Sequence, residues 1–257
     1  MRPNVFRLVA AVAAAAVLAF TASVRAQSVD ELLKKAAVFD QRFEADEALK
    51  YFLAAEKLDP KNPRPLVAIA RQYRYLMADA TEKEEKLRLG RIALTYSQRA
   101  AALGPNDAEA QLAVGITYGK MLPFLGSKEQ VDASPRIKKS VDAALRIDPR
   151  NDTAWHILGR WHRVLADVSG LKRMLAGAIY GSLPKGSNEA AAGALEKAIA
   201  LNPNRLMHYI ELGRIYLQMG RADEARKFLT KGLSMPNQEK DDPETKARGR
   251  EALAKLR

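Results

Sequence analysis

The side chains that could catalyse a reaction or hold a metal ion are few in this sequence. Cysteine is absent and histidine occurs three times in 257 residues, which excludes disulfides, thiolate nucleophiles and thiolate metal sites. His156 and His162 lie about 240° apart around a helix, so one helix cannot present both to one metal ion. No serine, histidine and acid form a pattern typical of nucleophilic catalysis, and no carboxylate pair has a catalytic setting. We therefore expect no catalytic residue, no metal site, no cofactor and no enzymatic activity.

Basic side chains at regular helical positions indicate binding instead. In arrays of paired helices, the first helix of each pair lines the concave face, and its exposed positions lie one and four residues after a small core residue. Arginine is frequent at these positions. We predict a partner-binding groove formed by Arg71, Arg74, Lys120, His156, Arg160, Arg163 and Arg214. The arginine fork binds two oxygens of a carboxylate or phosphate, which favours a partner with anionic groups.

A solvated basic surface is the alternative interpretation of these arginines, because 42 basic and 30 acidic side chains give the chain a formal net charge of +12. We expect the gathered charges to repel one another and to add little to stability. An anionic partner would relieve that repulsion, and its binding would weaken as salt rises. Single-stranded nucleic acids require basic residues interleaved with exposed aromatic side chains. Because the N-terminal pattern described below predicts export, we expect no nucleic-acid partner.

The elements that must position these residues form an internal repeat. Four amphipathic segments end at a proline, which cannot continue a helix. Each carries an alanine five residues earlier: Ala55, Ala100, Ala144 and Ala198. A second helical pattern follows each proline, clearest in the i, i+3, i+4, i+7 spacing of Tyr209, Leu212, Gly213 and Tyr216. This is the tetratricopeptide pattern of helix–turn–helix repeats, in which Gly159 and Gly213 mark close approaches of two helices.

We predict an all-α fold: a tetratricopeptide-like right-handed α-solenoid of about five degenerate helix–turn–helix units plus a C-terminal capping helix at residues 243–256. The intervals between the four prolines are 45, 44 and 54 residues, against a typical repeat of about 34. We expect the additional residues between the two helices of a unit, at 79–89, 121–134 and 163–187. Apolar residues on one face of 171–179 predict an extra helix over the groove, with a lid or membrane contact as the alternative.

The N-terminus has the pattern of a secretory signal peptide. Arg2 and Arg7 are basic, residues 8–20 are thirteen consecutive apolar residues, and Val24 and Ala26 are small residues suited to a cleavage site. An uncleaved anchor is the alternative, although a bilayer span needs about 20 apolar residues. We predict a signal peptide at 1–26 and a helical repeat domain at 27–257. The mature protein is expected to be exported, and periplasmic in a Gram-negative host, without a transmembrane span.

The order of these features over residues 29–256 resembles the regulator of microtubule dynamics family. The most specific stretches are Leu158 to Trp161, Ser169 to Ala176, Ile179 to Pro184, Ala194 to Ala198 and Leu212 to Leu217. The resemblance implies a non-enzymatic, all-helical protein. It also implies relatives in eukaryotes that associate with microtubules, some of which bind or transfer phospholipid. Because tubulin does not occur in a periplasm, the microtubule role is not carried over.

Two functions therefore remain open from the sequence. The first is an interaction module that binds a partner protein or peptide in the basic concave groove. The alternative is a phospholipid-binding or phospholipid-transfer module, as in some relatives of the family that the chain resembles. Phospholipid that purifies with the protein in stoichiometric amount would favour the second, and an open polar groove would favour the first.

Overall fold

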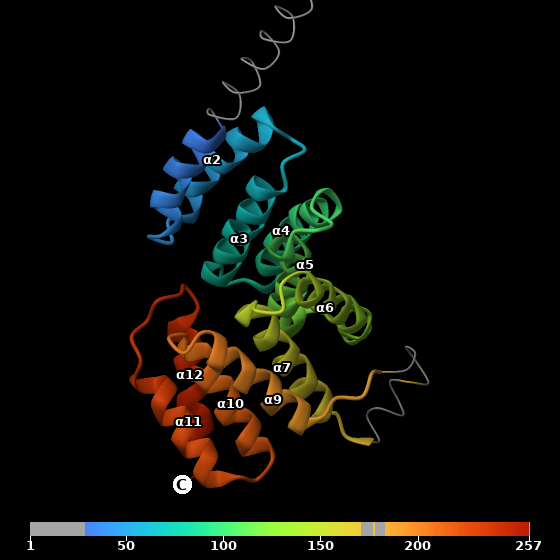
Figure 1. Cartoon of the computed structure of the whole chain (residues 1–257), viewed down its shortest axis with the longest axis vertical. Coiled ribbons are helices and arrows are strands. Elements are labelled where there is room, and N and C mark those ends of the chain that lie inside the picture. The colour runs from blue at the N-terminus through green and yellow to red at the C-terminus, as the bar shows by residue number, and fades with distance from the viewer. Residues whose placement is uncertain (1–28, 171–176, 178–182, 257) are drawn as a thin grey trace, which may run out of the picture.

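The computed structural model describes residues 29–170, 177 and 183–256, and every regular element in these ranges is a helix (Figure 1). The all-α prediction is therefore confirmed. The predicted signal peptide and most of the predicted helix at 171–179 lie outside the described residues.

Helices packed in sequence order make up the molecule. After a first helix at residues 29–40, the chain forms α2 (Ala45–Leu58), α3 (Pro63–Asp79), α4 (Lys83–Leu103), α5 (Ala108–Met121), a short 3-10 helix η1 (Leu122–Phe124), α6 (Ser127–Ile147), α7 (Asp152–Ala166), α9 (Asn188–Leu201), α10 (Leu206–Gln218), α11 (Ala222–Ser234) and α12 (Asp242–Ala254). The pairs α3/α4, α5/α6, α7/α9 and α10/α11 pack together, and α12 packs on both α10 and α11. With the pair that opens the array, these are the five predicted units and the capping helix.

A proline followed two residues later by a capping Asn or Asp forms the turn between units. Asn62, Asp107 and Asn151 each lie two residues after a turn proline and cap the following helix. Their side-chain oxygens accept hydrogen bonds from backbone N–H groups of the first helical turn, which have no partner within the helix. The corresponding position in the last unit is Arg205, whose side chain does not cap α10. That arginine is used elsewhere, in the polar network of the site.

Small residues bring the paired helices close, as the repeat pattern predicts. The four alanines that precede the turn prolines are all 0% exposed. A Cβ atom on Gly159 would lie 1.6 Å from Leu195 Cδ2, and a Cβ atom on Gly213 would lie 2.6 Å from Leu229 Cγ. Both glycines therefore stand where the backbone of a first helix meets a side chain of the second.

The additional residues of two units are accommodated differently from our expectation. Helices α4 and α6 are each 21 residues long, so most of the residues expected between the helices of these units lie inside the second helix. In the unit formed by α3 and α4, three residues connect the helices. Extending a helix buries more apolar surface without leaving backbone polar groups unpaired, which an added loop would do.

Candidate functional site on the concave face

The surface formed by helix 29–40, α3, α5, α7 and α10 carries all seven predicted groove residues, and we call it the concave face. On α3, Arg71 is already paired within the fold. Its guanidinium forms an ion pair with Asp40, at the end of helix 29–40, and Nε donates to Asp40 Oδ1 over 3.3 Å. Gln72 Nε2 donates to the same carboxylate at 2.7 Å. Asp40 therefore fixes helix 29–40 against α3, the first helix of the next unit.

Arg74, also on α3, is buried without a carboxylate partner among the described residues. Its side chain leads to α5, where Nη1 donates to Thr117 Oγ1 at 3.1 Å, and Thr117 shares a hydrogen bond with Ser97 of α4. Burial, reinforced by the neighbouring charge of Arg71, lowers the pKa of Arg74 to about 10. The guanidinium is thus held in place by neutral hydroxyl groups.

A buried acid gathers the basic residues of the last two units. Arg163 Nε on α7 donates to Glu211 Oε1 at 2.6 Å, and Arg214 Nη1 on α10 donates to Oε2 at 2.8 Å. Burial alone would favour the neutral form of Glu211. The charges of Arg163, Arg160 and Arg214 outweigh that effect and hold its pKa far below the usual value. Arg160 acts only through space, because it forms no ion pair with any described residue.

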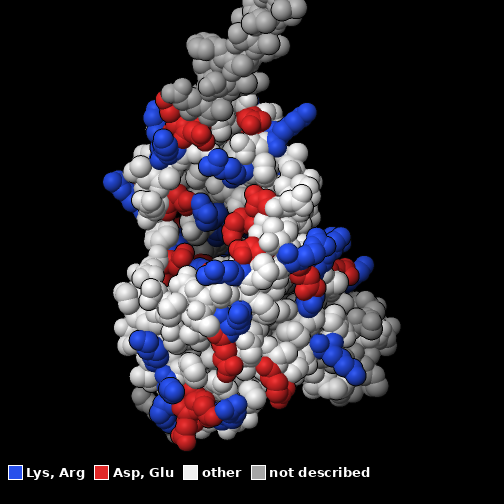
Figure 2. Space-filling model, in the orientation of Figure 1, with Lys and Arg blue, Asp and Glu red and all other residues white. Residues whose placement is uncertain are grey.

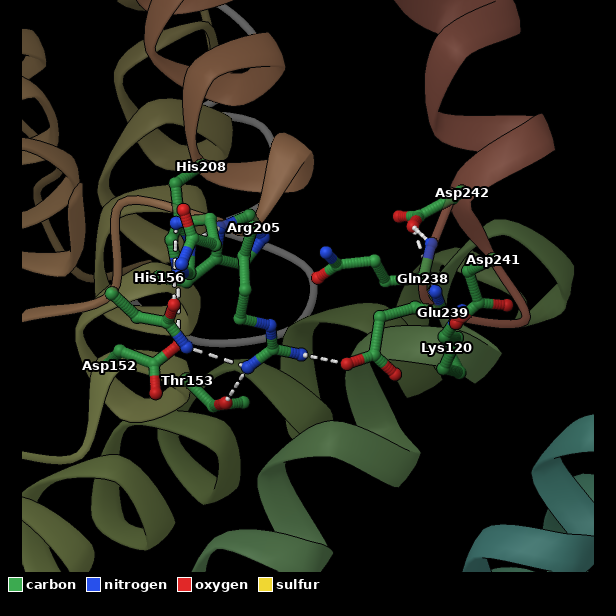
Figure 3. A network of polar contacts seen from close by, with 12 residues as sticks. Lys120, Asp152, Thr153, His156, Arg205, His208, Gln238, Glu239, Asp241 and Asp242 are labelled. Atoms are coloured by element: carbon green, nitrogen blue, oxygen red, sulfur yellow. Dashed lines mark hydrogen bonds and ion pairs between the residues drawn. The ribbon is translucent and has the colours of Figure 1, made fainter. Parts of the chain in front are cut away.

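Two buried histidines form a hydrogen-bonded pair beside this cluster (Figure 3). His208 on α10 lies with Nδ1 3.1 Å from Nδ1 of His156 on α7, and its Nε2 lies 2.9 Å from Asp152 Oδ2. An ionised Asp152 accepts the Nε2–H of a neutral His208, whose Nδ1 then accepts the Nδ1–H of His156. Burial lowers the pKa of both histidines. The neutral pair satisfies every hydrogen bond seen here.

The segment between α11 and α12, residues 235–241, crosses the concave face, and we call it the strap. Figure 1 shows it turning up from α11 toward α3, and Figure 3 shows its acidic side chains. Glu239 pairs with Arg205 at 3.3 Å, Lys240 pairs with Asp79 of α3 at 2.9 Å, and Asp241 pairs with Lys120 of α5.

Arg205 and the first residue of α12 complete the anchorage of the strap. Arg205 Nη1 also contacts Asp152 and Thr153 at the start of α7, at 3.0 and 2.6 Å. Asp242 Oδ2 accepts the backbone N–H groups of Gln238 and Glu239 at 2.7 and 2.8 Å, which shapes the strap itself. The C-terminal end of the array is thereby tied to its second, third and fourth units.

The structure corrects one expectation about the predicted groove residues. We expected basic side chains facing solvent and repelling one another, but Arg71, Arg163, Arg214 and Lys120 each pair with a carboxylate of the same chain, and His156 pairs with His208. In the described part of the chain, Arg74 and Arg160 are the members of the predicted set without such a partner. The concave face is a mixed, largely paired surface that already receives an acidic segment of its own chain.

Sequence reasoning missed the acidic partners Asp40, Glu211, Glu239 and Asp241. One signal was available for Glu211. It lies two residues before the small residue of its unit, where the other units carry Ile157, Ala113 and Ala68. An acid in an otherwise apolar position indicates a buried ionic partner. No comparable pattern marks the strap.

The residues that the structure describes contain no group of three or more histidine, cysteine or acidic side chains that could hold a metal ion. No helix in the same ranges is long and apolar enough to cross a membrane.

Two solved structures have a similar fold. A thermophilic TPR protein of Thermus thermophilus superposes with a TM-score of 0.63 at 21% identity, covering 88% of this chain and 99% of that one. The pilF protein of Pseudomonas aeruginosa gives a TM-score of 0.55 at 13% identity, covering 90% of both chains. At these identities the likeness shows the fold alone, and it confirms the predicted α-solenoid.

Sequence relatives are more specific. Regulator of microtubule dynamics protein 1 of Bos taurus is 25% identical over 235 residues, which are 90% of this chain and 73% of the relative. Regulator of microtubule dynamics protein 2 of Mus musculus is 22% identical over 190 residues, so the chain matches 46% of that relative's length. A family model described as Regulator of microtubule dynamics protein 1-3 matches residues 27–257. Since that match spans all the described helices, the chain belongs to this family.

Proposed function

We propose that the chain is a non-enzymatic interaction module whose concave face binds an anionic segment of a partner protein. The observation that supports this most strongly is a contact within the chain itself. The acidic strap lies against basic residues of α5 and of the turn before α10. A surface that accepts two carboxylates from its own chain has the charge and the geometry to accept others.

The cations without a carboxylate are where a partner would add new contacts. Arg74 and Arg160 are charged, at least half-buried and unpaired within the described residues, so a carboxylate placed near them gains a charge-assisted hydrogen bond with little water to compete. The carboxylates already on this face, such as Asp40 and Glu239, repel a partner whose negative charges would lie beside them. The density of charged groups on this face argues against enclosure of an acyl chain.

The test is partner binding with a charge-matched control. A partner recovered with residues 27–257 at low salt is identified, purified and titrated against three proteins: wild type, Arg74→Gln with Arg160→Gln, and Arg146→Gln with Arg150→Gln. The last two arginines are exposed at the outer end of α6 and in the turn after it. We expect the first pair to weaken binding at least tenfold and the control pair to change it less than twofold. Binding should also weaken as salt rises.

Two results would contradict this function. Equal weakening by both variant pairs would assign binding to net charge rather than to the concave face. Stoichiometric phospholipid in the purified protein, detected by solvent extraction and mass spectrometry, would assign the face to a lipid.

We also propose that the mature protein works outside the cytoplasm. The family match begins at residue 27, directly after the segment that has the composition of a signal peptide. Intact-mass measurement on protein from an export-competent host should give a chain beginning at Gln27. Recovery of residues 1–26 on the protein in the membrane fraction would contradict this.

A further inference from the structure

Three consecutive side chains of the strap reach three different parts of the concave face. Each forms an ion pair there: with the turn before α10, with the end of α3 and with α5. In that order the pairs are Glu239–Arg205, Lys240–Asp79 and Asp241–Lys120. Figure 3 shows Glu239 directed toward Arg205. The strap thus presents the charges minus, plus and minus, in that order, to the surface beneath it.

The surface around the strap also carries charges of both signs. Figure 2, in the orientation of Figure 1, shows basic and acidic side chains together around a hollow where the strap approaches the N-terminal helices. A segment that lies on such a surface is selected by the order of its charges, because each side chain must meet a group of opposite sign. The strap meets this condition at three consecutive positions.

Ion pairs, rather than apolar packing, hold the middle of the strap on this face. Met235 is buried at one end of the strap and Asp242 is buried just beyond the other, whereas residues 236–238 are exposed. Asp242 accepts hydrogen bonds from backbone N–H groups of the strap itself, so these bonds shape the strap without tying it to α3 or α5. The strap is therefore anchored at its ends and detachable between them.

Each of the three ion pairs is partly open to solvent, which makes the strap replaceable. The side chains of Glu239 and Asp79 are 44% and 54% exposed. Ion pairs at such positions are weak, because water competes for both partners and the side chains lose freedom when they pair. A second segment with the same order of charges can therefore take over the same partners without disrupting a packed core.

We propose that the strap occupies the place of the partner and that partner binding displaces it. In the complex, Lys120 and Arg205 pair with acidic side chains at positions i and i+2 of a partner segment. The residue between them is not acidic, because it lies beside Asp79. The proposal rests on the proposed function and adds the charge order of the partner and a competition within the chain. Contacts with Arg74 or Arg160, which the strap does not pair, give the partner its advantage.

Nuclear magnetic resonance titration with a peptide copy of the strap tests whether the site can be occupied from outside. The capped peptide Met-Pro-Asn-Gln-Glu-Lys-Asp-Asp, which repeats residues 235–242, is added to residues 27–257 carrying Glu239→Gln with Asp241→Asn. We expect saturable shifts of the Lys120 amide and of the Arg205 Nε–H. Wild type should bind the peptide at least tenfold more weakly, because its own strap competes at a high effective concentration. Absence of saturable shifts in the variant would overturn the proposal.

Two altered peptides test the order of charges. Met-Pro-Asn-Gln-Gln-Lys-Asn-Asp lacks the two acidic side chains at i and i+2 and should not bind the variant. Met-Pro-Asn-Gln-Glu-Glu-Asp-Asp is more negative than the strap sequence but should bind about fivefold more weakly, since its central glutamate would lie beside Asp79. Equal or tighter binding of this second peptide would overturn the proposed charge order.

A charge-matched variant separates competition from net charge. Glu85→Gln with Asp142→Asn removes two carboxylates from exposed ion pairs on α4 and α6, so it raises the net charge as much as the strap variant does. This control should bind the strap peptide as weakly as wild type, and equal tightening in both variants would overturn the competition. Circular dichroism checks folding. If the strap variant does not fold, Glu239→Gln alone decides, with about threefold tightening expected.

Titration with the purified partner distinguishes this proposal from the proposed function. The strap variant should bind that partner about tenfold more tightly than wild type, the effect of removing two partly exposed ion pairs, and the control variant should differ less than twofold. If the partner needs Arg74 and Arg160 but binds the strap variant and wild type alike, the proposed function stands and the competition fails. If the strap peptide binds at Lys120 but no protein partner needs the concave face, the proposed function fails and the strap site stands.

Discussion

Glu211 shows at the scale of single residues how a basic surface can be structural. Its carboxylate is enclosed by arginines from α7 and α10, and each of its oxygens accepts one guanidinium hydrogen bond. Removing one partner of such a pair leaves a buried charge without compensation, which costs much more than the pair itself contributes. Arg163 and Arg214, the two arginines that donate to Glu211, therefore contribute to the stability of the fold, whatever the partner requires.

The first prediction concerns this cluster. Arg163→Met should lower the free energy of unfolding by about 3–5 kcal/mol, because Glu211 then keeps only Arg214 as a hydrogen-bonded cation. Arg146→Met, on the exposed side of α6, should change it by about 0.5 kcal/mol or less. Urea unfolding followed by circular dichroism measures both. Equal stabilities of the two variants would show that Glu211 is not ionised in the fold.

The second prediction concerns the histidine pair. Burial depresses the folded-state pKa of His156 and of His208, so below about pH 6.5 the unfolded chain binds more protons than the folded one. Stability is then fully present above that pH and is lost as the pH falls, by up to about 1.4 kcal/mol per pH unit for each histidine. The contribution of ionised Glu211 to stability is lost at lower pH, as the pH falls from the ordinary glutamate pKa toward its depressed value in the fold.

Unfolding free energies from pH 5.0 to 7.5 check the histidine prediction. The double variant His156→Gln with His208→Gln should be less stable at pH 7.5 and should show a flatter pH dependence. His162→Gln is the comparison, because that histidine lies outside the pair. Burial lowers the pKa of His162 as well, so this variant should flatten the pH dependence, but less than the double variant. A slope in the double variant equal to the slope in wild type would contradict the assignment.

The residue scale also shows what the sequence could and could not predict about the site. Spacing predicted that the basic residues lie on the first helix of each unit, and they do, because a position on a helix depends on local periodicity. Their partners come from other helices, such as Asp40 for Arg71 and Glu211 for Arg163, 31 and 48 residues away in the chain. Nothing in local periodicity encodes those pairings. The strap was missed for the same reason, because its contacts depend on how the whole array curves.

At the scale of the helices, small residues decide how closely two elements pack. Gly159 and Gly193 lie on the paired helices α7 and α9 but in opposite environments. A Cβ atom on Gly159 would collide with fully buried Leu195, whereas a Cβ atom on Gly193 would meet nothing within 4 Å. The same substitution should therefore have opposite effects on the two helices.

The third prediction uses that contrast. Gly159→Ala should destabilise the fold by about 1–3 kcal/mol through overpacking. Gly193→Ala should stabilise it by about 0.5–1 kcal/mol, because alanine restricts the unfolded chain and favours the helix. Thermal midpoints and urea unfolding compare the two variants directly. Destabilisation by both would mean that α9 has no open face at Gly193.

The ends of the helices show which boundaries sequence periodicity can predict and which it cannot. The turn prolines and the alanines before them predicted where units end, since proline stops a helix and alanine permits close approach in any repeat of this kind. The pattern did not predict that α4 and α6 absorb the additional residues of their units. Residues such as Lys83 and Ser127 are compatible with either a loop or a first helical turn, and only packing against neighbouring helices selects the helix.

At the scale of the whole molecule, the strap joins parts of the array that are far apart in sequence. Its ion pairs are partly exposed, and pairs of this kind contribute about 0.2–1 kcal/mol each. The strap should therefore open more readily than the helices that it connects, and its opening should respond to the acidic residues that hold it.

The fourth prediction follows from this. Glu239→Gln with Asp241→Asn should increase amide hydrogen exchange in residues 237–241 while exchange in the buried part of α3 stays as in wild type. Glu224→Gln, which removes the exposed ion pair between Glu224 of α11 and Arg221 just before that helix, is the control and should leave the strap unchanged. Equal acceleration in α3 and the strap would show that the two do not open separately.

In most repeat arrays a unit can be added or removed without disturbing distant units, because each unit contacts only its neighbours. The contact of Lys240 with Asp79 and of Asp241 with Lys120 removes that freedom here. A unit inserted between α6 and α7 would carry the strap away from α3 and α5 even if the new unit stacked without a fault. A longer array would therefore lose the contacts of the strap with α3 and α5.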